Sequence, residues 1–431
     1  MPTNEKNFCI GPWSEIRISP NGDLNYCHRS DWPSQGELGY YDNISTQDLD
    51  SYFTGPTATQ VRNQLLDGSS VKGCQPCYDD EKKIEFSFRR RRNIQMAIFP
   101  NDDFAKSLKE SSFSNRISSN YKPLFYNIST SNLCNLGCVM CSEKFSSRLA
   151  SEFKKIGIQR YNDSHKHPSV LLDWSQDNIL WEKFMQHILS NDQIVCVHFQ
   201  GGEPFLHQRV MDFIDRCIEG NHVNFHFTTV TNGTIYDEVL IEKLKKFRTV
   251  QIEISLENTK KSNDYVRYPS DTTEVVNNIK KYSNHISEKF DIVVRSVPQL
   301  LTVLDYDSLL EFCLESDLIV DSNIIHTPNF FGVNLLPQHL KDLAASQLTK
   351  FISNTSSEGS FYNSINVRNR GYLRQNLADN AKMIMTAMNQ PLAPNSHKLV
   401  SDCRGYLQKL DTSRKISLHN YCPEIADWLY D

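Results

Sequence analysis

The middle of the chain alternates short apolar runs with segments of helical periodicity, and this alternation constrains the fold more than any other feature. Strands are predicted at Leu124–Ser129, Ile194–Gln200, Asn224–Val230, Val250–Leu256 and Asp291–Val297. Helices are predicted between them at Phe145–Ile156, Val210–Glu219, Val239–Lys245 and Thr273–Ser283. Repeated strand–helix units predict an α/β fold with a parallel sheet, either doubly wound or closed into a barrel.

A chain of 431 residues is too long for one ordinary core, so two or three domains are expected. Changes in composition and periodicity along the chain predict four segments. They are a turn-rich domain at 1–95, a polar, serine-rich linker at 96–120, the α/β core at 121–340 and a helical segment at 341–431. Within the last segment, helices are predicted at Asn366–Met388, at Asp402–Leu410 and from Cys422 onward.

The turn-rich N-terminal segment contains a predicted β-hairpin. The runs Ile16–Ser19 and Leu24–Cys27 alternate apolar and polar residues, and Pro20–Asp23 joins them. A Pro-Asn-Gly sequence between two such runs is a strong turn signal, so we expect two antiparallel strands here.

Charge and hydropathy argue against two classes of partner. The net charge of −5 gives no basic field that would attract a phosphate backbone, so we expect no nucleic-acid partner. The local basic run Arg89–Arg92 is typical of a solvated helix face. No apolar h-region precedes Cys9, and no apolar stretch approaches the ~20 residues that span a bilayer. We therefore expect a cytoplasmic protein without a membrane partner.

The 12 cysteines divide into clustered and scattered ones. The cytosol keeps thiols reduced, so clustered cysteines indicate metal or catalytic sites rather than disulfides. Scattered cysteines in apolar-periodic segments behave as small hydrophobes and are expected to be structural. The scattered ones are Cys196, Cys217, Cys313, Cys403 and Cys422.

Cys134, Cys138 and Cys141 form a CX3CX2C motif directly after the first predicted strand of the α/β core. Three thiolates on one short loop can hold a [4Fe–4S] cluster while one of its irons stays open to a small molecule. Gly137 is expected to let this loop turn tightly. Zinc is the alternative, but a closed structural zinc site takes four ligands, and no histidine neighbours this motif.

The motif and three later segments together resemble the radical S-adenosylmethionine (SAM) superfamily. Gly201-Gly202-Glu203-Pro204 ends the next strand and is similar to the family's GGEP segment, which implies a hydrogen bond to the methionyl amine of SAM. Thr231-Asn232-Gly233 matches a TNG that follows a later strand. Ser255 and Arg267 resemble the residues that hold the SAM carboxylate and ribose. The implied cofactor-binding residues are Gly201, Gly202, Glu203, Pro204, Asn232, Ser255 and Arg267, and the implied catalytic ones are Cys134, Cys138 and Cys141.

The resemblance also implies a fold and a reaction. The fold is a partial (β/α)6 barrel of the TIM type, whose sites lie at the carboxyl ends of the strands. In the reaction, a low-potential donor of the flavodoxin or ferredoxin type reduces the cluster. SAM is then cleaved to methionine and a 5′-deoxyadenosyl radical, which takes a hydrogen atom from the substrate.

Cys9, Cys27, Cys74 and Cys77 offer a second set of four ligands within residues 1–95. With Glu81, they resemble the twitch or SPASM type of auxiliary-cluster domain, which implies a second [4Fe–4S] cluster with a redox role. In many relatives this domain follows the barrel, whereas here it precedes it. Zinc is the alternative occupant, because a CX2C pair suits it.

The residues leave the substrate class open. Resemblance to twitch and SPASM enzymes favours a peptide or protein side chain as the substrate. A carbohydrate or other small metabolite is the alternative, because no obvious peptide-recognition domain precedes the cluster motif. A non-catalytic, zinc-stabilised binding protein is a third hypothesis, but it leaves the CX3CX2C motif and the later segments unexplained.

Overall fold

The computed structural model describes residues 7–27, 42–81, 87–90, 92–93, 122–158, 170–325, 327–355 and 370–431. The linker predicted at 96–120 lies outside these described residues. The chain folds as two compact units. Unit 1 comprises Met1–Asn132, Leu171–Thr228 and Lys246–Arg248, and unit 2 comprises Leu133–Val170, Thr229–Lys245 and Thr249–Asp431. These units cut across the predicted domain boundaries, which stay a prediction.

Unit 1 contains the first strands of the sheet. They are β1 (Glu15–Ile18), β2 (Leu24–Asn25), β3 (Phe125–Ile128), β4 (Cys196–Phe199) and the start of β5 (His226–Thr231). Strand β1 pairs antiparallel with β2, which confirms the predicted hairpin, and parallel with β3. Gly22 sits in its turn at a φ of 85°, a conformation that glycine adopts readily. The N-terminal segment therefore contributes two strands to the main sheet.

The helices of unit 1 begin and end at recognisable signals. Helix α3 has Pro56 at its first position and Gly68, at a φ of 83°, after its last. Asp177 caps α8, which buries Trp181 and Phe184. The helices are α1 (Gly11–Ser14), α2 (Leu49–Thr54), α3 (Pro56–Asp67), α4 (Gln75–Asp80), α8 (Asn178–Leu189) and α9 (Gln208–Glu219), with 3-10 turns η1 (Lys72–Cys74), η2 (Trp174–Gln176) and η3 (Pro204–Leu206).

Unit 2 continues the sheet with β6 (Thr249–Ser255), β7 (Phe290–Ser296) and β8 (Ile319–Ser322), which pair in parallel. The complete strand order is β2-β1-β3-β4-β5-β6-β7-β8, and β5 has residues in both units. The six strands from β3 to β8 follow one another in chain order. This arrangement confirms the predicted α/β fold with a mostly parallel sheet.

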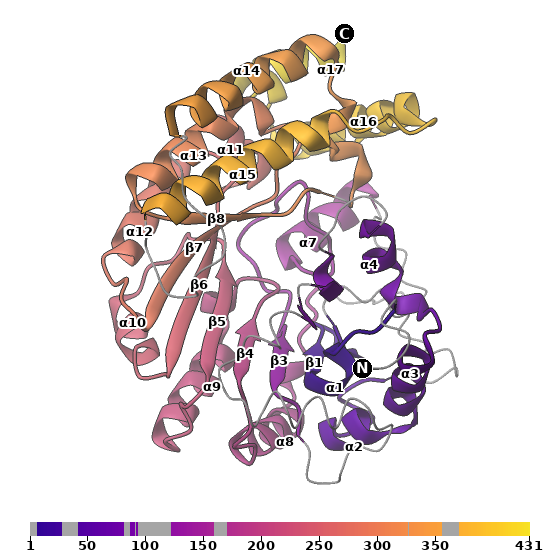
Figure 1. Ribbon diagram of the computed structural model, residues 1–431, viewed down its shortest axis with the longest axis vertical. Coiled ribbons are helices and arrows are strands. Elements are labelled where there is room, and N and C mark those ends of the chain that lie inside the picture. The colour runs from indigo at the N-terminus through magenta and orange to yellow at the C-terminus, as the bar shows by residue number, and fades with distance from the viewer. Residues whose placement is uncertain are drawn as a thin grey trace. The chain divides into compact units, whose positions relative to one another are not determined.

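The two faces of the strands in unit 2 differ in polarity. Ile252, Ile254 and Val294 are fully buried on the face that the helices cover, as the helices beside β6 and β7 in Figure 1 illustrate. Gln251, Glu253 and Ser255 alternate with the apolar residues along β6, as the period of two requires. The helices of unit 2 are α7 (Ser147–Ile156), α10 (Glu238–Leu244), α11 (Lys261–Val266), α12 (Thr272–Ser283), α13 (Tyr306–Glu315), α14 (Gln338–Thr355), α15 (Arg370–Met388), α16 (Ser396–Arg414) and α17 (Pro423–Tyr430), with 3-10 turns η4 (Val303–Asp305), η5 (Asn329–Phe331), η6 (Val333–Leu335) and η7 (Leu418–Asn420).

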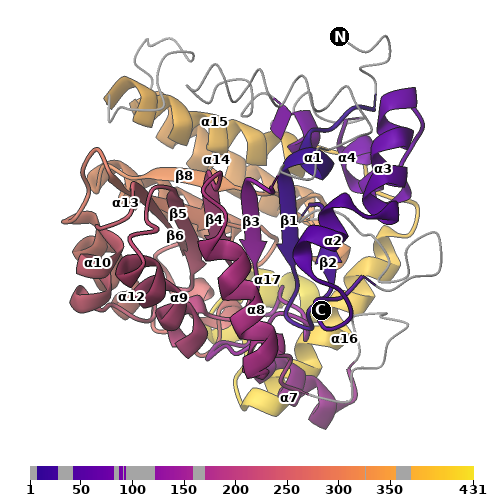
Figure 2. The same ribbon diagram turned by 90° about the horizontal axis from the view of Figure 1, so that it is seen from below.

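The edge of the sheet at β8 is closed by a helix rather than by another strand. Asn376 of α15 donates to the carbonyl oxygen of Val320 at 3.1 Å and accepts from its backbone N–H at 2.9 Å. Figure 2 shows α14 and α15 side by side next to β8. This pairing satisfies backbone groups that an exposed edge strand would leave open. In the part of the chain that the structure describes, no helix combines the length and apolarity needed to cross a membrane.

Candidate active site

The loop that carries Cys134, Cys138 and Cys141 belongs to unit 2 and is held by its own backbone. The N–H of Gly137 donates to the carbonyl oxygen of Tyr268 at 2.7 Å, and that of Val139 donates to Val266 at 2.8 Å. These two bonds tie the loop to the end of α11. The loop is therefore ordered by contacts that do not require a bound metal.

Gly137 lies where a buried guanidinium approaches the cysteine loop. It is not among the described glycines at positive φ, and its expected role in a tight turn stays a prediction. A Cβ at this position would lie 3.3 Å from Nη2 of Arg414. A Cβ here would press on this guanidinium, so glycine leaves room for its close approach to the loop backbone.

Asn232, predicted from the TNG segment, lies against the cysteine loop. Its Nδ2 donates to Oδ1 of Asn135 at 2.8 Å and lies 4.0 Å from Sγ of Cys134. Its Oδ1 accepts from the N–H and hydroxyl of Thr234 at 3.0 and 2.7 Å. Gly233 has a φ of 74°, and a Cβ there would collide with Ile254 at 2.7 Å. The TNG turn thus supports the loop at its first cysteine.

Two buried guanidiniums act on the thiol of Cys138. Burial raises the pKa of this thiol, whereas the positive charges of Arg267 and Arg414 lower it. Arg267 pairs with Glu257, and Arg414 pairs with Glu152 at 2.8 Å. Among the described residues, Nε of Arg267 and Nη1 of Arg414 are nevertheless buried without a hydrogen-bond partner. Buried donors of this kind are costly, so acceptors or negative charge are expected beside them.

This environment fits the iron–sulfur cluster that the motif implies. A cluster held by three thiolates is an anionic group, and it would offset the two guanidiniums beside Cys138. The N–H of Leu136 already donates to Sγ of Cys134 at 3.4 Å, as amides beside cluster thiolates do. Cys134, Cys138 and Cys141 are the residues that would hold the cluster.

Glu257 is a buried residue of the site that the motifs did not reveal. It is fully buried and accepts from the hydroxyl of Ser296 at 3.0 Å and the N–H of Val297 at 2.7 Å, besides pairing with Arg267. The available signal was a glutamate two residues beyond Ser255, just past the end of β6. Arg267 is therefore positioned by a carboxylate, a role that sequence alone did not indicate.

The GGEP segment, Gly201–Pro204, lies in unit 1. Gly201 and Gly202 have φ values of 81° and 62°, which residues with a side chain rarely adopt. Glu203 is buried, and its Oε1 accepts from the N–H of Phe205 at 3.1 Å. Pro204 then begins η3. The glycines thus serve the turn, and Glu203 caps the helix that follows.

Cys9, Cys27, Cys74 and Cys77 come together in unit 1, as the sequence predicted for a ligand set. Burial and the neighbouring Cys74 and Cys77 raise the pKa of Cys9 to about 12, although Arg89 lowers it. Burial, Cys27 and Cys77 likewise raise the pKa of Cys74 to about 12. These thiols are close enough to oppose one another's ionisation, so a cation bound among them would relieve that repulsion.

The basic run beside this cysteine set is structural, so the expectation of a solvated helix face is wrong for Arg89 and Arg92. Arg89 is buried, pairs with Glu81 at 2.5 Å and donates to the carbonyl oxygen of Phe8 at 2.6 Å. Arg92 pairs with the buried Glu15 of β1. Arg90 alone of the three has a half-exposed side chain. Arg91 lies outside the described residues.

The face of β6, β7 and β8 opposite the buried apolar residues carries an acid–arginine–acid arrangement. Nε of Arg295 donates to Glu253 at 2.6 Å, and Nη1 pairs with Asp321. Burial raises the pKa of Glu253, and Asp321 adds to this effect while Arg295 opposes it. Ser255 lies in register with Arg295 on the neighbouring strand. The predicted SAM-binding serine therefore lies beside a charged surface.

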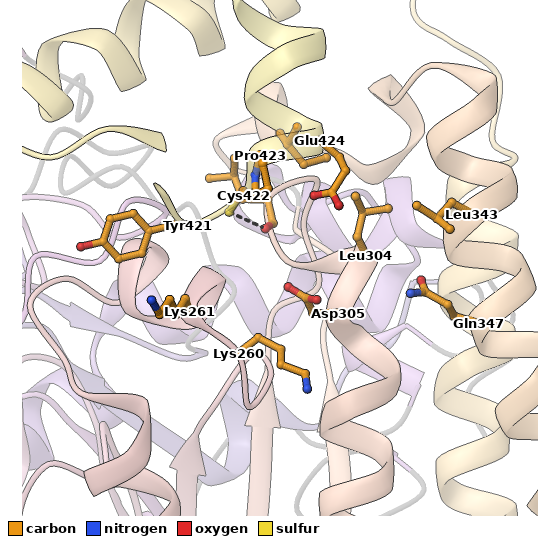
Figure 3. Close-up of a pocket in the computed structure, with 12 residues that line it drawn as sticks. Lys260, Lys261, Leu304, Asp305, Leu343, Gln347, Tyr421, Cys422, Pro423 and Glu424 are labelled. Carbon is orange, nitrogen blue, oxygen red and sulfur yellow. Dashed lines mark hydrogen bonds between the residues drawn. The ribbon is translucent and has the colours of Figure 1, made fainter. Parts of the chain in front are cut away.

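A pocket of about 360 Å³ lies elsewhere in unit 2, at the start of α17. Figure 3 shows Asp305 and Glu424 with Lys260 and Lys261 around it, and the dashed line marks the thiol of Cys422 donating to Leu301. Its lining includes no residue of the cysteine loop. The pocket therefore belongs to the contact between the C-terminal helices and the segment after β6.

The segment that contains the cysteine loop matches a known protein family. Residues 128–297 match the family model of the Radical SAM superfamily. No curated protein matches the sequence. Similar solved structures include "Native anSMEcpe with bound AdoMet", at 18% identity and a TM-score of 0.36 over 54% of this chain. Another is "Crystal structure of Streptococcus suis SuiB bound to S-adenosylmethionine", at 15% identity and a TM-score of 0.38 over 86% of this chain. The chain covers 61% of the first structure's length and 75% of the second's.

Residues 128–297 therefore match a Radical SAM superfamily domain, and the chain is an enzyme. The family implies SAM and a [4Fe–4S] cluster as cofactors. The family match does not name a substrate.

Proposed function

We propose that the chain reductively cleaves SAM and abstracts a hydrogen atom from a peptide or protein side chain, with an auxiliary cluster for electron transfer. One observation carries the first part of this proposal. The three-cysteine loop is preformed in unit 2, and two buried guanidiniums with unpartnered N–H groups act on Cys138. Such an arrangement suits an anionic cluster better than an empty loop.

The residues named for the site have distinct roles in this proposal. When bound, the reduced cluster and SAM supply a 5′-deoxyadenosyl radical, which abstracts hydrogen from the substrate. Cys134, Cys138 and Cys141 hold the cluster. Arg267, fixed by Glu257, offers its remaining N–H to the anionic end of SAM. The Gly201–Pro204 segment, Asn232 and Ser255 complete the proposed SAM-binding set.

We assign Cys9, Cys27, Cys74 and Cys77 to a second [4Fe–4S] cluster rather than to zinc. Tetrahedral zinc with bonds of about 2.3 Å needs its sulfur ligands roughly 3.8 Å apart. Among the described residues, the one set of three donor atoms within 4.8 Å of one another is Glu238, Glu242 and His285, which contains no cysteine. A four-iron cluster is larger than a zinc ion, so its thiolates stand further apart.

A peptide substrate is supported by the N-terminal cysteine set, whose resemblance to twitch and SPASM domains implies peptide modification. The charged surface of Glu253, Arg295 and Asp321 next to Ser255 would suit a polar substrate, because it combines carboxylates with a guanidinium. The electron donor would be a flavodoxin or ferredoxin.

The test is SAM cleavage by anaerobically reconstituted protein with a low-potential reductant. We expect 5′-deoxyadenosine as the product, measured by liquid chromatography and mass spectrometry. Changing Cys134, Cys138 and Cys141 to Ala should abolish it, whereas Cys313→Ala, a buried cysteine of α13, should not. Cleavage that survives the triple change would refute the proposed site.

A further inference from the structure

We infer that helix α16 of the C-terminal segment positions the cysteine loop through Tyr406 and Arg414, and that Arg414 tunes the cluster held there. This inference rests on the proposed function and assigns a task to the C-terminal helices. Residues 134–141 and α16 both belong to unit 2, far apart in sequence.

Two side chains of α16 reach carbonyl groups of the loop. The hydroxyl of Tyr406 donates to Val139 at 2.8 Å, and Nη2 of Arg414 donates to Gly137 at 2.6 Å. Both bonds are buried. Gly137 and Val139 are also the residues whose N–H groups bond to the end of α11. Their peptide groups are thus held from both sides, which leaves the loop between Cys134 and Cys141 little freedom to move.

Arg414 is itself fixed from three directions. Glu152 of α7 accepts its Nε at 3.0 Å and its Nη2 at 2.8 Å. Its guanidinium carbon lies 4.6 Å from the centre of the Tyr268 ring. The backbone carbonyl oxygen of the same Tyr268 accepts from the N–H of Gly137. A planar guanidinium can make these contacts together, whereas an ammonium cannot. This geometry explains why residue 137 is glycine.

The charge of Arg414 has a separate consequence. The guanidinium is 1% exposed, and its Nη2 bonds to the carbonyl oxygen of Gly137, the residue directly before Cys138. A positive charge buried beside the backbone that carries the cluster ligands would stabilise the more negative, reduced cluster. Arg414 is therefore a positioning residue whose removal should make reduction harder.

Hydrogen bonds of Asp411 and ring contacts of Tyr406 hold helix α16 beside the cysteine loop. Asp411, one turn before Arg414, accepts from the hydroxyl of Tyr265 on α11 at 2.7 Å and from the N–H of Leu418 at 3.0 Å. Tyr406 also contacts Phe153 of α7 and Phe331 of η5, with ring centres 6.0 and 5.9 Å apart. The helix thus contacts the same elements that flank the loop.

The experiment compares reconstituted wild type with Arg414→Gln, Arg414→Lys and Tyr406→Phe. Lys409→Met, an exposed residue of α16, is the control. Iron loss to a chelator should be roughly 10–100-fold faster for Arg414→Gln, as for other residues that support metal ligands. It should be about 2–10-fold faster for Tyr406→Phe, which removes one hydrogen bond without changing shape.

A redox titration followed by electron paramagnetic resonance separates charge from positioning. Arg414→Gln should lower the midpoint potential, whereas Arg414→Lys should retain it and still lose iron faster. Tyr406→Phe should keep the wild-type potential. If all three variants match Lys409→Met in iron loss and potential, the inference is wrong. If wild type itself takes up no iron at the loop, the proposed function fails instead.

Discussion

The cysteines of the loop in unit 2 come from residues 134–141, whereas those of unit 1 come from segments spread over residues 9–77. Backbone hydrogen bonds to Tyr268 and Val266 hold the loop. Burial and mutual repulsion raise the thiol pKa of Cys9 and Cys74 in the other set. We therefore expect the loop to depend less on its cluster for stability than the N-terminal set depends on its metal.

The largest effect should come from removing the metal of unit 1. Cys74→Ala with Cys77→Ala should lower the iron content from about eight to about four per chain. It should also remove most of the folding stability of the N-terminal region that contains this cysteine set. Cys138→Ala with Cys141→Ala should also lose about four irons, but it should hardly change thermal unfolding of the metal-free protein, because backbone bonds hold the loop. Elemental analysis and calorimetry measure both effects.

Two results would break this comparison. Equal destabilisation by the two double variants would show that the loop depends on its cluster as much as the N-terminal set does. One zinc with about four irons in wild type would replace the second cluster with a structural zinc site and remove its redox role.

The second prediction concerns the ion pair that supports the N-terminal set without binding metal. Glu81→Ala leaves the buried Arg89 without its carboxylate, which should destabilise the protein by about 3–5 kcal/mol in urea unfolding. Arg90→Gln is the control, because its side chain is half exposed and contacts the same carboxylate at 3.8 Å; it should cost about 1 kcal/mol or less. A similar cost for both changes would mean that Arg89 does not support this set.

Much of this comparison could be predicted from sequence, because it depends on local pattern. The CX3CX2C spacing located the loop, and the period of apolar residues located β3 to β7 with α7, α9, α10 and α12, but not α8 or α11. The hairpin of β1 and β2 followed from its turn residues. Each of these signals involves residues that are neighbours in the chain, so their spacing reports directly on local geometry.

What sequence could not predict depends on contacts between distant segments. Arg89 and Arg92 looked like a solvated run, because nothing local shows that Glu81 and Glu15 lie beside them. The link from Arg414 to Gly137 spans 277 positions, so no periodicity could reveal it. Glu257 and the short β8 were missed for related reasons, since a buried carboxylate and a four-residue strand carry weak local signals.

The third prediction tests whether Arg267 serves the cofactor as well as the fold. Arg267→Ala should weaken SAM binding by about one to two orders of magnitude, because a charge-assisted hydrogen bond contributes about 1.5–3 kcal/mol. In the double variant Arg267→Ala with Glu257→Gln, the carboxylate that would otherwise be left unpaired is also removed. Any loss of SAM affinity that remains in this variant is then due to the missing contact between Arg267 and SAM. Lys261→Ala, exposed on the same helix, is the control for calorimetry. An unchanged affinity with intact iron content would limit Arg267 to a structural role.

The smallest effect sharpens the comparison by testing contacts in unit 1 that involve no cysteine. Asp50 of α2 contacts His187 of α8 at 3.3 Å and Lys122 at 2.9 Å. The hydrogen bond with His187 and the charge of Lys122 outweigh burial and hold the pKa of Asp50 at about 2. An aspartate in the unfolded chain has a pKa of about 3.9, so this stabilisation is complete above that value and is lost as the pH falls toward about 2.

The side chain of Asp50 is half exposed, so the effect on stability should be small. The urea midpoint of wild type should therefore fall slightly more between about pH 5 and about pH 3 than that of Asp50→Asn. An equal fall in the urea midpoint for the two proteins would show that these contacts contribute nothing to stability.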